Sequence, residues 1–222
     1  MKDKILFSWS GGKDSALALH SILHNKEFEV AALLTTITAD YDRISMHGVR
    51  RELLEKQAES IGLTLEKISI SKKSGNEEYE DKMKSVLLRY KNEGINAVAF
   101  GDIFLEDLKK YREENLAKVG LRGIFPLWKQ SSYVLAKRFI ELGFKAIITC
   151  VDSKQLDGKV CGREYDNKLL SELPKNVDCC GENGEFHSFV YAGPIFKNEI
   201  PFNKGEIVLR DNQFYFCDLI AA

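Results

Sequence analysis

The sequence lacks the features that would indicate a membrane protein, a disulfide scaffold or a strongly charged binding module. No stretch approaches the roughly 20 apolar residues that a membrane-spanning helix needs. The five cysteines are odd in number and scattered, which is not typical of a disulfide framework. With 32 basic and 33 acidic side chains, the formal net charge is -1, so no overall field attracts nucleic acid or an anionic membrane. We expect a cytoplasmic protein with reduced thiols.

Two common motifs are also missing. The phosphate loop that has four residues between its first glycine and a Gly-Lys-Ser/Thr ending does not occur. There is no Cys-x-x-Cys pair. The 44% hydrophobic and 29% charged residues are ordinary for a globular protein, and 222 residues suffice for one large domain or a main domain with a smaller appendage.

A glycine turn lies between an apolar stretch at residues 5–9 and an amphipathic stretch at 16–23, and this pattern predicts a strand, a turn and a helix. Its sequence is Ser10-Gly11-Gly12-Lys13-Asp14-Ser15. Paired glycines permit crowded backbone conformations and let an anion approach the amides. The helix N-terminus adds N–H donors and the positive end of its dipole. A polyphosphate is therefore the expected ligand, and a plain strand-to-helix turn is the alternative.

Apolar and amphipathic segments then alternate, which predicts an α/β fold with parallel strands. We expect further strands at residues 28–37, 64–70, 95–100 and 145–151, and helices at 47–61, 79–90, 105–119, 131–142 and 166–173. A polar loop is expected at 72–76. A closing hairpin is expected from 206–210 and 213–219, joined at Asp211-Asn212. The composition changes at 121–128, so we predict two domains over residues 1–125 and 126–222.

Polar residues follow two of the predicted strands, at the edge where open α/β sheets bind ligands. Thr35 lies near the end of the stretch at 28–37, and Gly101-Asp102 follows the stretch at 95–100. Asp102 can hold Mg²⁺ against bound phosphates, because hard cations prefer carboxylate oxygens. A helix-capping role for Asp102 and a purely structural role for Thr35 are the alternatives.

A second polar cluster occupies residues 178–188. Glu182, Glu185 and His187 are suited to general-base catalysis or to holding an ammonium ion. Alternation along a strand would place Glu185 and His187 on the same face. Solvated turn residues are the alternative interpretation of this cluster.

Taken together, these motifs resemble a known family. Ser10 to Ser15 resembles the signature of the PP-loop ATP pyrophosphatases. Four further motifs follow along the chain: Gly101-Asp102-Ile103, Arg112-Glu113, Pro126-Leu127-Trp128 and the block from Cys180 to Ser188. Together with Ser10 to Ser15, and in this order, they resemble the diphthine-ammonia ligases of that superfamily. This resemblance implies a Rossmann-like parallel sheet of the adenine nucleotide alpha hydrolase type, with helices on both faces, followed by a smaller C-terminal α+β domain.

The resemblance also implies an activity. In that family ATP activates the carboxylate of diphthine, a modified histidine on elongation factor two, and ammonia then gives diphthamide, AMP and pyrophosphate. The implied cofactors are ATP and Mg²⁺, and the implied partners are ammonia and a carboxylate acceptor, with a homodimer left open. The nucleotide-binding residues would be Ser10, Gly11, Gly12, Lys13, Asp14, Ser15, Thr35, Gly101 and Asp102. The metal ligands would be Asp14 and Asp102, and the catalytic residues Lys13, Asp14, Glu182, Glu185 and His187.

The late block departs from the eukaryotic ligases, which have Glu-Gly-Gly-Glu-Tyr-Glu-Thr. Asn183 and His187 make this chain resemble a sister group with Asn-Gly-Glu-Phe-His, for which amidation of another carboxylate, as in corrinoid salvage, is an alternative. A PP-loop tRNA sulfur transferase and a non-catalytic adenine nucleotide-binding module are two further alternatives. The balanced charge and the absence of Cys-x-x-Cys disfavour the first of these, and the acidic block disfavours the second. His20 and His24, four residues apart, are expected to pack rather than bind zinc.

Overall fold

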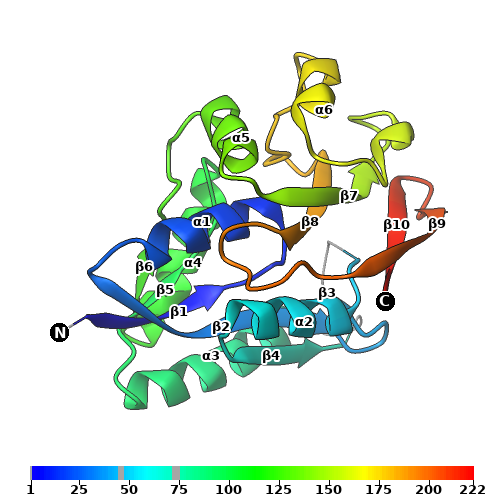
Figure 1. The fold of residues 1–222 in the computed structure, drawn as a ribbon. Helices are drawn as coiled ribbons and strands as arrows, with labels where there is room; N and C mark the ends of the chain where they lie inside the picture. The colour runs from blue at the N-terminus through cyan, green and yellow to red at the C-terminus, as the bar shows by residue number, and fades with distance from the viewer. Residues whose placement is uncertain (1, 45–47, 72–75) are drawn as a thin grey trace.

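A mostly parallel β-sheet forms the first half of the chain in the computed structural model, which describes residues 2–44, 48–71 and 76–222 (Figure 1). Its strands are β1 (Asp3–Ser8), β2 (Phe28–Thr38), β3 (Arg43–Ile44), β4 (Leu65–Ile70), β5 (Ala97–Ala99) and β6 (Arg122–Ile124). They run in the order β3-β2-β1-β5-β6, with β4 also paired to β2. Among the paired strands of the described residues in this sheet, only the short β2–β3 pair is antiparallel. The carboxyl ends of β1, β2 and β5 therefore share one edge.

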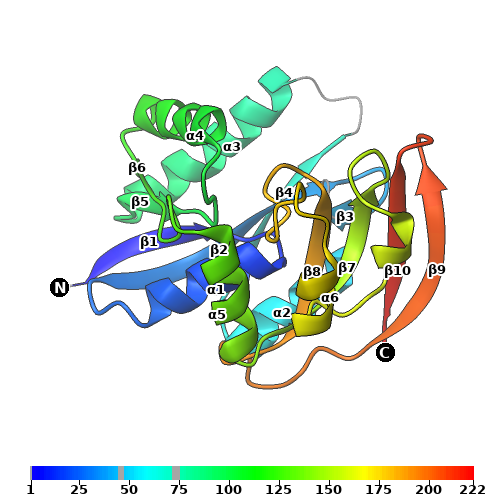
Figure 2. The ribbon, with the colours of Figure 1, turned by 90° about the horizontal axis from the view of Figure 1, so that it is seen from above.

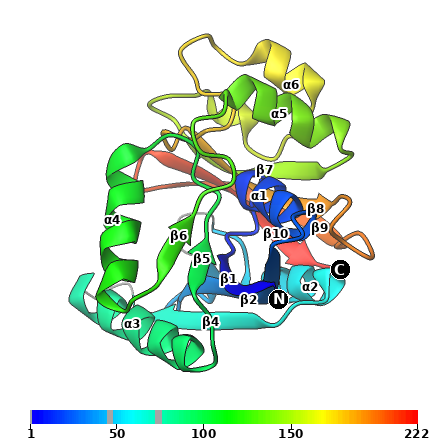
Figure 3. The ribbon, with the colours of Figure 1, turned by 90° about the vertical axis from the view of Figure 1, so that its left-hand side faces the viewer.

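Helices cover both faces of this sheet. They are α1 (Lys13–Leu23), α2 (Arg51–Ile61), α3 (Asn76–Asn92) and α4 (Glu106–Lys118). Figure 3 shows α3 and α4 on one side of the strands and α1 and α2 on the other. The predicted α/β architecture is confirmed. Apolar residues of β1 such as Ile5, Leu6 and Phe7 are completely buried because both faces of the strand are covered.

A smaller antiparallel sheet forms the second part of the fold. It contains β7 (Lys145–Asp152), β8 (Phe186–Ala192), β9 (Phe202–Arg210) and β10 (Phe214–Ala221). Its strands lie side by side in the order β8-β7-β10-β9 (Figure 2). The accompanying helices are α5 (Ser132–Glu141), the 3-10 turn η1 (Gly158–Val160) and α6 (Asn167–Glu172). This sheet confirms the predicted smaller α+β part.

The predicted closing hairpin is present as β9 and β10. Asp211 and Asn212 have φ angles of 49° and 50°, as the tight turn between two antiparallel strands requires. Aspartate and asparagine tolerate this left-handed region better than most residues. The turn at Asp211-Asn212 lies where it was predicted, whereas β9 begins at Phe202, earlier than the predicted start at residue 206.

Several elements differ from the sequence prediction in their type or in the residue at which they begin. The segment at 122–124, which was not among the predicted strands, is strand β6 and pairs with β5. A three-residue strand is too short to show a period. Helix α2 begins at Arg51, later than the predicted start at His47. His47 and residues 72–75 of the predicted polar loop lie outside the described residues.

One apolar core extends through both sheets. Phe7 and Leu19, from the first half, belong to the same buried cluster as Phe139, Phe186 and Phe189 from the second. A second cluster lies between the parallel sheet and helices α3 and α4. Within the described ranges, no helix is both long and apolar enough to cross a bilayer. The shared core brings β8 against the turn between β1 and α1.

Candidate active site

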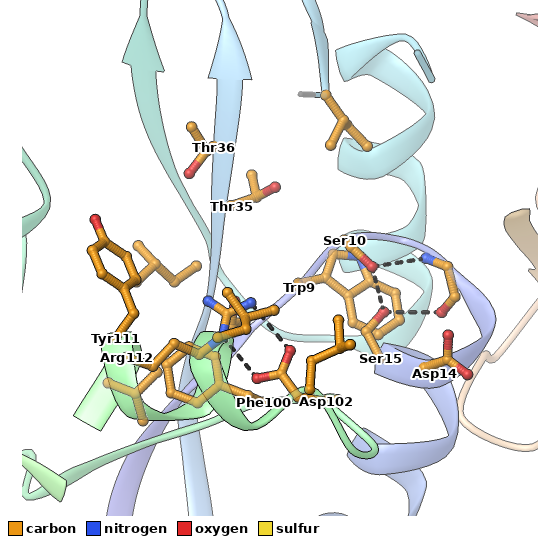
Figure 4. A pocket seen from close by; sticks show the side chains of 18 of the residues that line it. Trp9, Ser10, Asp14, Ser15, Thr35, Thr36, Phe100, Asp102, Tyr111 and Arg112 are labelled. Atoms are coloured by element: carbon orange, nitrogen blue, oxygen red, sulfur yellow. Dashed lines mark hydrogen bonds and ion pairs between the residues drawn. The ribbon is translucent and has the colours of Figure 1, made fainter. Parts of the chain in front are cut away.

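The glycine turn lies between the end of β1 and the first residue of α1. Gly11 has a φ of +76°, and a Cβ atom there would lie 2.8 Å from Oε1 of Gln57, so this position requires glycine. The Ser10 hydroxyl donates to Oγ of Ser15 over 3.1 Å, and Oγ of Ser15 donates to the Gly12 carbonyl over 2.9 Å (Figure 4). The turn is therefore preorganised at the positive end of α1.

Strand β8 and helix α2 hold this turn from outside. The Gly11 carbonyl accepts from the Val190 amide over 2.9 Å and from Nε2 of Gln57 over 3.1 Å. Gln57 is fully buried, donates to the Val190 carbonyl and accepts from the indole N–H of Trp9. The Lys13 amide donates to Oγ of Ser188 over 3.1 Å. The second sheet is thus bonded directly to the glycine turn.

Lys13 and Asp14 form a close ion pair at the start of α1. Nζ of Lys13 lies 2.7 Å from Oδ2 of Asp14 and also donates to the Cys180 carbonyl. Burial lowers the pKa of Lys13, but the neighbouring Asp14 carboxylate reverses this effect and the net shift is upward. Burial also raises the pKa of Asp14, against the opposing effect of Lys13. Lys13 therefore keeps its charge although its side chain is only 4% exposed.

Asp102 is already paired in this structure. Nε and Nη2 of Arg112, on α4, donate to its two carboxylate oxygens over 2.7 and 3.2 Å. Figure 4 shows this two-point pair below the ends of the strands. Both Asp102 and Asp14 line the cavity, but Asp102 is only 10% exposed and is a less open metal ligand than expected, whereas the Asp14 side chain is 28% exposed. Mg²⁺ is commonly bound by one or two carboxylates together with substrate phosphates, so Asp14 fits such an ion.

Glu182 reaches across from the late polar block to the parallel sheet. Its Oε1 accepts from the Ile103 amide over 2.8 Å, just after β5. Burial raises the pKa of Glu182 to about 7, although the hydrogen bonds from the Ile103 and Phe104 amides oppose this shift. Its carboxylate lines the same cavity as Lys13 and Asp14. A carboxyl group that titrates near neutral pH in a cleft is suited to proton transfer.

The structure gives Glu185 a different environment from the predicted one. It is only 2% exposed and does not line the cavity. Its oxygens accept from the Asp178 amide and from both the backbone and side-chain nitrogens of Asn183 over 2.9 to 3.0 Å. Strand β8 begins after Glu185, so the expected strand alternation with His187 does not apply. Glu185 shapes the loop, while His187 lines the cavity.

A cavity of about 720 Å³ joins these groups. Thr35 lies on its wall with Thr36, and the Thr35 hydroxyl is buried without a hydrogen-bond partner among the described residues. Such a group indicates a missing polar partner at this end of the cavity. The cavity contains the predicted residues Ser10, Gly12, Lys13, Asp14, Ser15, Thr35, Gly101, Asp102, Glu182 and His187, whereas Gly11 and Glu185 lie behind its wall.

Several lining residues were not among the predicted site residues. Helices α3 and α4 contribute Tyr79, Met83, Leu87, Tyr111 and Arg112 to the cavity wall. The helical spacing of Tyr79, Met83 and Leu87 is typical of a core face, and only Arg112 carried a functional signal, through its place in the family pattern. Gln57, which holds the glycine turn, had no sequence signal of its own.

His20 of α1 and His24, the residue that follows α1, pack against each other. The ring centroids of His20 and His24 lie 4.1 Å apart, and the edge of His20 contacts Phe144. Burial lowers the pKa of His20. The thiols of Cys150 and Cys161 are buried, and burial raises the pKa of each to about 12, so they are poor nucleophiles.

Comparisons with known proteins agree with this arrangement. The family profile described as "Diphthamide synthase N-terminal domain" matches residues 1–123, and the profile "Diphthamide synthase C-terminal domain" matches residues 131–219. These two ranges contain the glycine turn and the late polar block, respectively.

Among curated proteins, the chain is similar to proteins named diphthine–ammonia ligase. The human protein is 30% identical over 67% of this chain and 58% of its own length. The Bos taurus protein is 28% identical over 90% of this chain and 82% of its own length. The Schizosaccharomyces pombe protein is 30% identical over 92% of this chain, which spans only 37% of that protein. The two family profiles match most of the chain, and residues of both matched ranges line one cavity. The chain therefore belongs to the diphthamide synthase family.

Proposed function

We propose that this protein is an ATP-dependent amide ligase that adenylates a carboxylate and amidates it with ammonia, releasing AMP and pyrophosphate. One observation carries the proposal: the glycine turn with Lys13 and the late loop with Glu182 line the same cavity. An enzyme of this kind needs a phosphate site and a base within reach of one acceptor. The names of the related proteins support the same reaction class.

The glycine turn would hold the pyrophosphate part of ATP. The amides at the start of α1 and the charge of Lys13 would bind its oxygens, and Asp14 would hold Mg²⁺. The ion would supply charge neutralisation on the leaving pyrophosphate. The hydroxyl of Thr35, which has no hydrogen-bond partner among the described residues, would bind the nucleoside.

Glu182 would act in the second half-reaction. When ammonia attacks the acyl adenylate, a C–N bond forms, AMP leaves with the electron pair of the acyl C–O bond, and the nitrogen loses a proton. Glu182, with a pKa of about 7, would accept that proton. His187, on the same cavity wall, would face the acceptor. Glu185 would keep the loop in shape through Asn183.

The acceptor would be a carboxylate, either protein-borne diphthine or a small molecule. The names of the related proteins favour diphthine. Asn183 and His187 instead favour the sister group with the Asn-Gly-Glu-Phe-His block, in which the acceptor would be a carboxylate other than diphthine. We also infer cytoplasmic residence, because the five cysteines are free thiols. A homodimer stays a prediction.

The proposal is tested by incubating the protein with ATP, Mg²⁺, ammonium and each candidate acceptor. We expect AMP and pyrophosphate in equal amounts, dependent on the acceptor. The variant His187→Ala should retain ATP binding but form less product. Formation of ADP and phosphate would contradict the proposal, and nucleotide turnover without any acceptor would contradict the ligase reaction.

A further inference from the structure

Arg112 projects from α4 into the cavity with its guanidinium group held on two sides. Its Nε and Nη2 atoms bind Asp102, as described above. Its guanidinium carbon lies 4.5 Å from the ring centroid of Phe100, which in turn stacks on Phe125 at a centroid distance of 5.4 Å. The side chain therefore has a defined position, although it is half-buried and lines the cavity.

This arrangement leaves part of the guanidinium group available. Arginine has five N–H donors in a rigid fork, and the bonds to Asp102 use Nε and Nη2. Nη1 of Arg112 makes no hydrogen bond to another of the described residues. A cation fixed by a carboxylate and an aromatic platform, with donors left over, is suited to a planar or tetrahedral oxyanion.

The position of Arg112 indicates which oxyanion this side chain binds. Gly101, next to Asp102, packs against the start of α1, since a Cβ atom there would lie 2.9 Å from the Ser15 amide nitrogen. Figure 4 shows Arg112 between Asp102 and the pair Thr35 and Thr36, with Ser10 and Ser15 farther along the cavity. Because the glycine turn, Thr35 and Arg112 line one cavity, a nucleotide whose pyrophosphate lies at the glycine turn and whose nucleoside lies at Thr35 would have its α-phosphate in the part of the cavity that Arg112 lines.

We propose that Arg112 binds the α-phosphate of the nucleotide, with Asp102 and Phe100 as positioning residues. This inference rests on the proposed function. In adenylation, a carboxylate oxygen forms a bond to the α-phosphorus, the bond from that phosphorus to the bridging oxygen breaks, and its electron pair leaves with pyrophosphate. Negative charge on the α-phosphate oxygens is then stabilised by donors that are already in place. Asp102 thus acts through Arg112 rather than as a metal ligand.

The test compares the binding of AMP and adenosine by calorimetry, because these ligands differ only in this phosphate. We expect the wild-type protein to bind AMP more tightly than adenosine. Arg112→Ala should lose roughly 10- to 100-fold in AMP affinity, with adenosine affinity unchanged. Arg122→Ala is the matched control, because Arg122 also pairs with an aspartate, Asp3, but lies on the surface. Its affinities should equal those of the wild type.

Each other result has a defined meaning. Unchanged AMP affinity in Arg112→Ala would overturn the inference alone, and an equal loss for adenosine would assign Arg112 a structural role and overturn it as well. A wild-type protein without preference for AMP would also overturn the inference, whereas a wild-type protein that does not bind ATP would overturn the proposed function. If the Arg112→Ala variant has a much lower melting temperature than the wild type, the Arg112→Lys variant is measured instead. Lysine keeps the charge without the fork, so reduced AMP affinity with normal adenosine affinity supports the inference, and unchanged AMP affinity contradicts it.

Discussion

At the residue scale, the site is built from paired charges whose surroundings set their properties. Lys13 binds both Asp14 and the carbonyl of Cys180, so a residue of the late loop helps to place the lysine of the glycine turn. Glu182 and Glu185 lie three residues apart, yet one lines the cavity and the other is surrounded by backbone donors. Identical side chains therefore have different roles because of their burial and their partners.

Removing the charges at the start of α1 should abolish turnover. We expect Lys13→Ala and Asp14→Ala each to lower the rate of AMP formation by about 100-fold or more, because each loses a fixed charge next to the phosphates. Pyrophosphate release measures this effect. Lys145→Ala is the control, since Lys145 forms an exposed pair with Glu199 and should have normal activity. Activity of Lys13→Ala within a fewfold of wild type would refute the assignment.

The pKa of Glu182 predicts a pH dependence. As a base, Glu182 must be ionised, so the rate should rise with pH and level off above about pH 7. In Glu182→Gln this rise should disappear and the rate should be low at every pH. Glu185→Gln should keep the rise near pH 7, because Glu185 does not reach the cavity, but it should melt at a lower temperature. If the rate of the Glu182→Gln variant still rises with pH, the general base is a residue other than Glu182.

The same pKa shift has a consequence for stability. Folding raises the pKa of Glu182 from 4.5 to about 7, so the folded state binds more protons between these values. The contribution of Glu182 to stability is thus complete below about pH 4.5 and is lost as the pH rises through 7. We therefore compare the melting temperature of Glu182→Gln with that of the wild type at two pH values. The melting temperature of the variant minus that of the wild type should be larger at pH 8 than at pH 4.5. Thermal melts at both pH values measure this change.

At the element scale, the glycine turn depends on two elements that follow it in the chain. Helix α2 supplies Gln57, and strand β8 supplies Ser188 and Val190. Glycine gives the turn its conformation, but the buried hydrogen bonds from these elements select that conformation over others. The turn is consequently a product of the fold as well as of its own sequence.

Gln57 is the clearest test of this dependence. We expect Gln57→Ala to lower the free energy of unfolding by about 2 kcal/mol or more, since it leaves the Trp9 indole and the Gly11 and Val190 carbonyls with fewer buried partners. Urea unfolding measures this loss, and nucleotide affinity should fall with it. Gln130→Ala, which removes one exposed bond to the Pro126 carbonyl, should cost less than about 0.5 kcal/mol. Equal costs in the two variants would show that the buried network adds no stability.

At the scale of the whole molecule, the two sheets share a core and a site. Phe186 and Phe189 of β8 belong to the same buried cluster as Phe7 and Leu19. The predicted division between residues 125 and 126 stays a prediction, and the two family profiles divide the chain nearby, between residues 123 and 131. The shared cluster implies that neither part completes its core alone.

We therefore expect calorimetry of the whole chain to give one cooperative transition whose calorimetric and van't Hoff enthalpies agree. A fragment of residues 1–125 should expose the face of α1 that packs under the second sheet, bind apolar dyes and lose nucleotide affinity. Adding a fragment of residues 126–222 should restore part of the affinity. Two separate transitions, or a fragment 1–125 that binds ATP normally, would show independent domains.

Local patterns sufficed for most of the architecture. Alternation of apolar strands and amphipathic helices predicted the parallel sheet, and Asp211-Asn212 located the hairpin. Both signals act over a few residues, through backbone geometry and the burial of one face. The shortest elements, β3 and β6, lacked such a signal because two or three residues show no period, and only their pairing to longer strands makes them strands.

The sequence by itself determined the class of fold, the glycine turn with Lys13 and Asp14, and the set of polar residues from which the site is drawn. Only the tertiary structure decided which of them meet. The Lys13 amide binds Ser188, 175 residues later, Arg112 neutralises Asp102, and Glu185 turns into its own loop. These outcomes depend on long-range contacts and on exclusion from water, because burial and a specific partner, rather than residue type, set the charge and the role of each group.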